Sequence, residues 1–251
     1  MKQYQTSFKS RIIRQLVSFI GPDLDYAYYA SIGSFDFCDS NLFSKYFTDV
    51  DGKDYVEGKI GSTSVVFSFV RSKRTIDIPF IPSKEFTGFF LKADFNKDFL
   101  GQIYVLPDIA ENLLGFVGKE LQELDIFRGQ LVNLEDSEFE KLFKVYSNNQ
   151  ITARYILTTS LMKRITKLNS NVSEEIYISF IDSKMYLAIP YFYDLFEAKY
   201  LSSMLDFGTI LGYFEYLELL IGIVDELNLN ENSWRKDLRN VEVQNENNRR
   251  I

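Results

Sequence analysis

The hydrophobic pattern changes period several times along the chain, and each change marks a predicted element. Residues 7–20 place apolar side chains at a spacing near 3.6, which predicts an amphipathic helix that Gly21-Pro22 ends. Residues 23–53 have no regular period and predict irregular structure. The apolar stripe of the predicted helix comprises Phe8, Ile12, Ile13, Leu16, Val17, Phe19 and Ile20.

Four β-rich runs follow this irregular stretch, with turn residues between them. Gly61-Ser62 and Asn96-Lys97 supply two of these turns, and Pro79 and Pro82 mark a longer connection. The pattern predicts an antiparallel meander of about four strands. The runs cover residues 55–60, 64–70, 86–93 and 102–106.

Helical spacing returns after Pro107. Two capping boxes, at 108–111 and 137–140, predict short helices, the first ending near Gly115. A brief strand is expected at 143–146, and Ser147 and Thr158 are the expected caps of helices at 148–157 and 159–168. The apolar face of the last helix comprises Leu161, Met162, Ile165 and Leu168.

A β-hairpin and one long helix complete the pattern. The runs 176–181 and 185–189 flank the turn residues Asp182-Ser183-Lys184, which predicts the hairpin. Residues 205–228 predict a buried helix rather than a bilayer span, because five acids interrupt the apolar stretch.

The order of these elements predicts an α+β fold, in which a mostly antiparallel sheet (a meander plus a later hairpin) packs with several helices. Regular βαβ alternation is missing. No linker divides the chain, so we expect a single domain over 1–239 and a flexible tail over 240–251. The outline also resembles a pleckstrin-homology-like barrel, which we keep as an alternative topology.

The composition removes many chemistries. The 251 residues include no histidine and one cysteine, Cys38, which excludes histidine-based catalysis, internal disulfides and thiolate zinc cages. No phosphate-binding glycine loop is present. We therefore expect no catalytic residue, no cofactor and no metal ligand. The 23 phenylalanines and 16 tyrosines form a core, and an exposed group such as Tyr191-Phe192-Tyr193 suits a partner.

Charge is distributed unevenly. The net charge is −7, which argues against a nucleic-acid partner. The first 20 residues carry Lys2, Lys9, Arg11 and Arg14 without an acid, whereas residues 21–233 sum to −13. These four basic side chains are candidates for facing an anionic membrane surface, and a solvated helix face is the competing interpretation.

Several segments resemble the DUF3137 family, bacterial proteins of unknown function. Two distinctive runs are Phe-Thr-Gly-Phe-Phe at 86–90 and Ala-Arg-Tyr-Ile-Leu-Thr at 153–158. Further similar segments lie at 67–68, 93–97, 105–108, 134–140, 145–147, 195–197 and 227–230, and the resemblance covers roughly residues 8–236. Thr159 and Ala198 stand where the family pattern leads us to expect proline.

The resemblance implies a soluble domain that is often preceded by membrane-spanning segments, and it implies no activity. Because residues 1–251 contain no such segment, we expect either a short member or a piece of a longer protein.

Two groups of side chains are candidate sites. Arg154 lies in an apolar helical context, which predicts a buried guanidinium that is paired with Glu138, Glu140 or Glu197; anion binding is the alternative. The acids near strand ends, Asp94, Asp98 and Asp108, form the second group, either as a catalytic or Mg²⁺ site or as turn and cap residues.

Three functions remain open from the sequence. The leading hypothesis is a non-enzymatic interaction or adaptor domain, cytoplasmic and tethered near the inner face of a membrane, with an unknown protein partner. The second is a carboxylate-based, Mg²⁺-dependent hydrolase or phosphotransferase. The third is a small-ligand sensor with an aromatic pocket.

Overall fold

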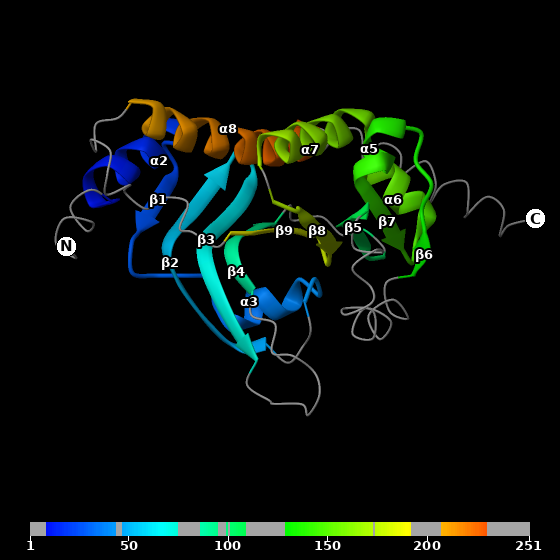
Figure 1. Cartoon of the computed structure of the whole chain (residues 1–251), viewed down its shortest axis with the longest axis horizontal. Helices are drawn as coiled ribbons and strands as arrows, with labels where there is room; N and C mark the ends of the chain where they lie inside the picture. The colour runs from blue at the N-terminus through cyan, green and yellow to red at the C-terminus, as the bar shows by residue number, and fades with distance from the viewer. Residues whose placement is uncertain are drawn as a thin grey trace, which may run out of the picture.

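The fold is built on one sheet of nine strands, shown in Figure 1. The structure is a computed structural model that describes residues 9–43, 47–74, 86–94, 99, 101–108, 129–172, 174–191 and 207–229. The strands are β1 (Leu24–Ala27), β2 (Phe47–Ile60), β3 (Thr63–Arg74), β4 (Phe86–Asp94), β5 (Ile103–Pro107), β6 (Gln130–Leu131), β7 (Phe143–Ser147), β8 (Tyr177–Ile181) and β9 (Lys184–Pro190). Every adjacent pair is antiparallel, and the order is β1-β2-β3-β4-β9-β8-β5-β7-β6.

The helices complete the α+β fold, so the predicted fold class is confirmed. A π-helical turn, η1 (Lys9–Ile13), leads into the first α-helix. The α-helices are α2 (Arg14–Ile20), α3 (Ser34–Asp39), α5 (Ser137–Leu142), α6 (Gln150–Ile156), α7 (Thr159–Asn171) and α8 (Phe207–Leu229).

The predicted four-strand meander is correct for three strands and wrong for the fourth. β2, β3 and β4 pair in sequence, but the β8–β9 hairpin lies between β4 and β5. β5 pairs instead with β8 and β7, and all five of its residues are buried. A fully buried strand has to hydrogen-bond its backbone groups on both edges, which an edge position in the meander does not provide.

The sheet is open, so the alternative of a pleckstrin-homology-like barrel is wrong. Within the described part of the chain, β1 pairs only with β2 and β6 pairs only with β7. The β8–β9 hairpin was expected, and its turn is tighter than predicted, because Ile181 already pairs with Lys184. Asp182 and Ser183 adopt φ angles of 47° and 66°, the left-handed geometry of a two-residue hairpin turn.

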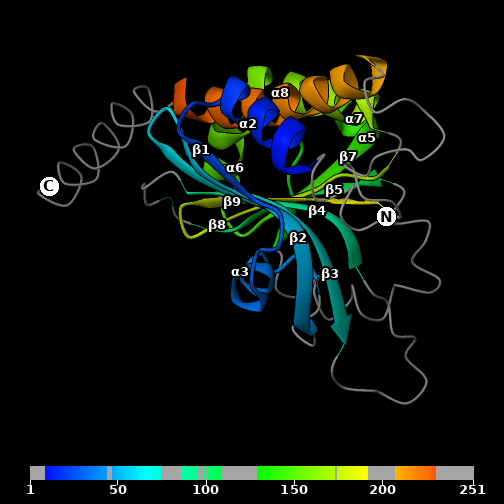
Figure 2. The same ribbon diagram turned by 90° about the vertical axis from the view of Figure 1, so that its left-hand side faces the viewer.

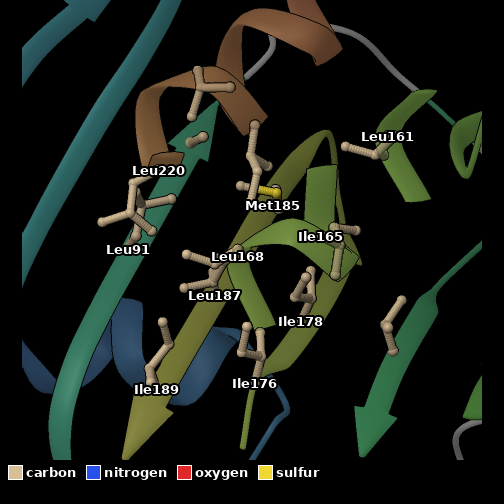
Figure 3. Packing of buried hydrophobic residues seen from close by; sticks show 14 of the residues in the cluster. Leu91, Leu161, Ile165, Leu168, Ile176, Ile178, Met185, Leu187, Ile189 and Leu220 are labelled. Carbon is tan, nitrogen blue, oxygen red and sulfur yellow. The ribbon is translucent and has the colours of Figure 1, made fainter. Parts of the chain in front are cut away.

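The main core lies between one face of the sheet and a layer formed by α2, α8, α7, α5 and α6. Figure 2 shows this layer on one side of the sheet and α3 on the other. The predicted apolar face of α7 is buried in this core, and Leu161, Ile165 and Leu168 are fully buried. Figure 3 shows Leu220 of α8 and Leu161 of α7 above the sheet residues Leu91, Met185 and Leu187.

A second, smaller core lies under α3 on the opposite face. Phe37 of α3 is buried, and its ring contacts those of Phe43, Phe86 and Phe90. Ser68 and Ser179 of the sheet bond to the backbone around α3, through the amide of Ile32 and the carbonyl oxygen of Ser40. Both β1 and α3 fall in the stretch that was predicted to be irregular.

The helix caps follow the predicted chemistry with shifts of one or two residues. Thr158 caps α7 as predicted, because its hydroxyl accepts a hydrogen bond from the amide of Leu161 at 3.2 Å. Asp136, not Ser137, caps α5, and Asn149, not Ser147, caps α6. A carboxylate one position earlier, in α5, and an amide two positions later, in α6, provide the same kind of acceptor.

Some expectations lie outside the described residues. They are the body of the helix predicted after Asp108, the domain boundary at 239 and the tail 240–251.

Candidate interaction surface

Two exposed apolar side chains and one half-buried aromatic ring lie on the outer side of α2 and α8, and we call them the apolar patch: Phe19, Leu211 and the half-buried Phe214. Phe19 is 79% exposed, and its ring centroid lies 6.0 Å from that of Phe214. Leu211 is 39% exposed, one turn before Phe214 on α8. α2 and α8 lie side by side in Figures 1 and 2, so the patch spans two elements far apart in sequence. Grouped exposed apolar side chains are typical of interaction sites.

The helical spacing predicts that Phe19 belongs to the apolar, core-facing stripe of its helix, and that prediction is wrong. Ile13 and Val17 are buried, and Ile12, Leu16 and Ile20 pack against the core at their side. These five side chains already fill the core-facing side of the segment. Phe19 is therefore left on the outer side with Arg11.

The four basic residues proposed to face a membrane are not equivalent. Lys2 lies outside the described residues, and the side chain of Lys9 is not described. Arg11 is exposed. Arg14 donates a hydrogen bond to the carbonyl oxygen of Tyr26 on β1, at 3.0 Å. Because β1 is an edge strand, Arg14 caps an edge carbonyl group that would otherwise be open to another strand.

Arg154 is exposed, so the prediction that it is buried is wrong. Its guanidinium donates to the carbonyl oxygen of Gln150 at 3.3 Å, and among the described residues it forms no ion pair with a carboxylate. Glu140 accepts instead from the amide of Leu134, and Glu138 is exposed, while Glu197 lies outside the described residues. The helix context is less apolar than it looked, because the neighbouring Ile151 is itself exposed.

Since Arg154 reaches only solvent and its own helix, Arg154→Ala is expected to change the free energy of unfolding by less than about 0.5 kcal/mol. Urea unfolding of the variant and the wild type measures this difference. A loss of about 3 kcal/mol, the size expected from stranding a buried acid, would contradict the exposed position.

The three acids proposed as a catalytic or Mg²⁺ site do not converge. β4 and β5 run in opposite directions, so Asp94 at the end of β4 and Asp108 after the end of β5 lie at opposite ends of the sheet. Asp108 lies 3.2 Å from the Nζ of Lys144. Asp98 lies outside the described residues, among which no group of three or more Asp, Glu or Cys side chains could hold a metal ion.

The motifs that resemble the family have structural roles where the structure describes them. Gly88 lies where β4 meets the end of β9, and a Cβ atom there would meet the carbonyl oxygen of Ile189 at 2.2 Å. Asp136 caps α5, and the hydroxyl of Ser147 donates to the carbonyl oxygen of Gln102 at 2.8 Å. These residues fix strand contacts and helix starts.

Two tyrosines join the end of β9 to α8. Tyr216 is buried, with its ring edge-on to Phe89 at 5.6 Å and 6.2 Å from the ring of Tyr191. Burial raises the pKa of Tyr191 from 10.0 to about 12, and it raises the pKa of Tyr216 well above its ordinary value. Tyr191 was predicted to be exposed with Phe192 and Tyr193; it is half-buried, and the other two lie outside the described residues.

These pKa shifts predict a loss of stability in alkali. Between pH 10 and about 12 the unfolded chain releases these tyrosine protons while the folded chain keeps them, so the free energy of unfolding falls as pH rises. Tyr191→Phe is expected to reduce this slope in urea unfolding followed across pH, and the same substitution at the exposed Tyr29 is the matched control. An unchanged slope in Tyr191→Phe would refute the assignment.

No helix in the described part of the chain combines the length and the apolar character that crossing a membrane requires.

Comparison with known proteins gives one family and one remote structure. The family model described as protein of unknown function (DUF3137) matches residues 84–229, more than half of the chain. No curated protein matches the chain. One solved structure, the crystal structure of the mycobacterial trehalose monomycolate transport factor A, TtfA, aligns at 13% identity and a TM-score of 0.38. The alignment covers 83% of this chain and 94% of that one, and at this TM-score it supports no conclusion about fold or function.

Proposed function

The chain belongs to the DUF3137 family of proteins of unknown function, and we propose that it is an interaction domain that binds a protein partner through the apolar patch. The observation that carries the proposal is the contact between the exposed ring of Phe19 and the half-buried ring of Phe214, which come from different helices. Aromatic side chains at the centre of an interface contribute much of its binding energy.

The charges beside the apolar patch define the chemistry of the partner. Arg11 is exposed on the same helical segment as Phe19, and Glu215 is exposed directly after Phe214. A complementary partner therefore presents apolar side chains, with an acid on the side of Arg11 and a base on the side of Glu215. An adaptor that recognises such a segment needs no catalytic group.

Two observations weigh against the other functions that the sequence left open. A carboxylate enzyme built on Asp94 and Asp108 loses its shared site, because these residues lie at opposite ends of the sheet. The aromatic pocket of a ligand sensor finds no support in the rings around Phe37, because they pack on one another as a small core.

Comparison of three baits tests the proposal: the wild-type chain, Phe19→Ser and Phe35→Ser. Phe35 is the matched control, because it is 78% exposed but lies on α3, on the other face of the sheet. We expect wild type and Phe35→Ser to retain the same partner protein from native lysate, and Phe19→Ser to lose it. Equal retention by all three baits would exclude the apolar patch as the binding surface.

A second candidate is orientation on the cytoplasmic face of a membrane, favoured by Arg11 and Phe19 sharing the outer side of one helical segment. Basic side chains gain about 1 kcal/mol each near anionic lipid, which orients a tethered domain without anchoring it. Co-sedimentation with anionic and neutral vesicles at low salt tests this role. Binding to anionic vesicles only, lost when Lys2, Lys9 and Arg11 are neutralised, is expected. Arg14 is left intact because it caps β1, and equal sedimentation of both forms would rule the role out.

A further inference from the structure

Two exposed charged stripes of opposite sign lie on the neighbouring helices α7 and α8. Lys163 and Lys167 are exposed on α7, and Glu215 and Glu218 are exposed on α8. On each helix the buried side chains occupy the opposite side, facing the sheet. We call Lys163 with Lys167 the basic stripe and Glu215 with Glu218 the acidic stripe.

The two helices are fixed to each other, so the stripes have a defined spacing. Arg164 reaches across from α7, and its Nε lies 2.8 Å from Oε2 of Glu226, whose side chain is buried. Gly222 leaves room for this arginine, because a Cβ atom there would lie 3.0 Å from Nη1 of Arg164. The pair ties the two helices together, with Arg164 partly exposed and Glu226 buried.

The four stripe residues do not neutralise one another within the chain. In the residues that the structure describes, the ion pairs are Lys92–Asp36, Lys144–Asp108 and Arg164–Glu226, and none involves a stripe residue. The two stripes carry opposite charges and lie on one surface. A second copy of the chain, rotated by 180° about an axis in the plane of this surface, therefore presents a complementary arrangement of charges. Such an axis places the basic stripe of each copy over the acidic stripe of the other.

We propose that this surface binds a second copy of the chain, with the basic stripe on α7 facing the acidic stripe on α8 of the partner. A two-fold contact of this kind is isologous, so each complementary pairing occurs twice. Exposed ion pairs contribute little individually, and the proposal therefore describes a weak dimer that forms at low salt.

Salt gives this dimer a distinctive signature. Each copy has a net charge of −7, so two copies repel each other in general, and added salt relieves that repulsion. Non-specific association would strengthen with salt. Association through complementary stripes weakens with salt, because screening reduces the attraction between the opposite charges.

Sedimentation velocity with two charge-reversed variants tests the proposal. Lys163→Glu with Lys167→Glu makes both stripes acidic, and Glu215→Lys with Glu218→Lys makes both basic. Wild type is expected to self-associate at low salt. Each variant alone is expected to have a dissociation constant at least about tenfold higher, because like charges then face each other. An equimolar mixture of the two variants is expected to recover association, since opposite stripes meet again.

The controls separate a specific contact from a general charge effect. Lys59→Glu with Lys73→Glu makes the same change in net charge as the lysine variant, at exposed positions on β2 and β3, and is expected to retain association. Phe19→Ser is also expected to retain it. Glu215 borders both surfaces, so Phe19→Ser and the lysine variant, each of which changes one surface only, distinguish failure of this proposal from failure of the apolar patch. Circular dichroism verifies that each variant is folded. A wild type that is monomeric at low salt, or folded variants that do not associate when mixed, would overturn the proposal.

Discussion

Phe89→Ala is expected to lower the free energy of unfolding by about 4 kcal/mol, because it empties the contact that joins the sheet to the helical layer. Phe89 of β4 is 2% exposed. Its ring centroid lies 5.4 Å from that of Phe67 on the neighbouring strand and 5.6 Å from that of Tyr216 on α8. Removing the ring leaves a cavity between two elements that the surrounding structure cannot close.

Urea unfolding measures the effect, and Phe35→Ala is the matched control. Phe35 is the same residue type on the surface, so its replacement is expected to change stability by less than about 0.5 kcal/mol. Equal small losses at both positions would show that α8 does not depend on the contact with Phe89.

Gly88→Ala is expected to destabilise the fold by about 3 kcal/mol, since the added methyl group collides with backbone rather than with a movable side chain. The new Cβ atom would lie 2.2 Å from the carbonyl oxygen of Ile189 and 2.8 Å from the Cα atom of Pro190. The strands approach closely here, where the amide of Tyr191 donates to the carbonyl oxygen of Thr87 at 2.9 Å.

Gly212→Ala supplies a control with the opposite sign. Gly212 lies in α8 with nothing within 4 Å of its added Cβ atom, so alanine is expected to stabilise the helix by about 0.8 kcal/mol. Thermal unfolding of both variants separates the two effects. A Gly88→Ala protein as stable as wild type would mean that β4 and β9 are farther apart than described.

Features that depend on a few neighbouring residues, such as a helix cap, a buried helix face or a hairpin, were predictable from the sequence. The cap at Thr158 and the buried face of α7 follow from spacing alone, because each depends on residues within a few positions. The β8–β9 hairpin likewise follows from two β-rich runs around Asp182 and Ser183.

Partner choice between strands was not predictable, because it depends on residues far apart in sequence. The run that became β5 looks like the next strand of the meander, yet residues 177–190 enter between it and β4. The fully apolar sequence of β5 was the available signal, since an edge strand would expose part of it. β1 is only four residues long and carried no such signal.

The candidate surface was missed for a related reason. Periodicity shows that a helix has an apolar side. The first segment has seven apolar residues, and periodicity does not show which of them stays outside the core. Phe19 is left over because other side chains fill the core, and Phe214 meets it from a helix near the other end of the chain. Arg154 shows the reverse error, since an apolar neighbourhood in sequence proved to be partly exposed.

The most direct measurement of the central claim is photo-crosslinking in cells from a photoreactive amino acid placed at position 19 and, separately, at position 35. Both positions are exposed and carry phenylalanine, so each replacement preserves the fold and differs only in the face it reports. We expect a discrete crosslinked protein from position 19, lost on Leu211→Glu, and no such product from position 35. Identical products from both positions, or a position 19 product that Leu211→Glu leaves unchanged, would contradict binding through the apolar patch.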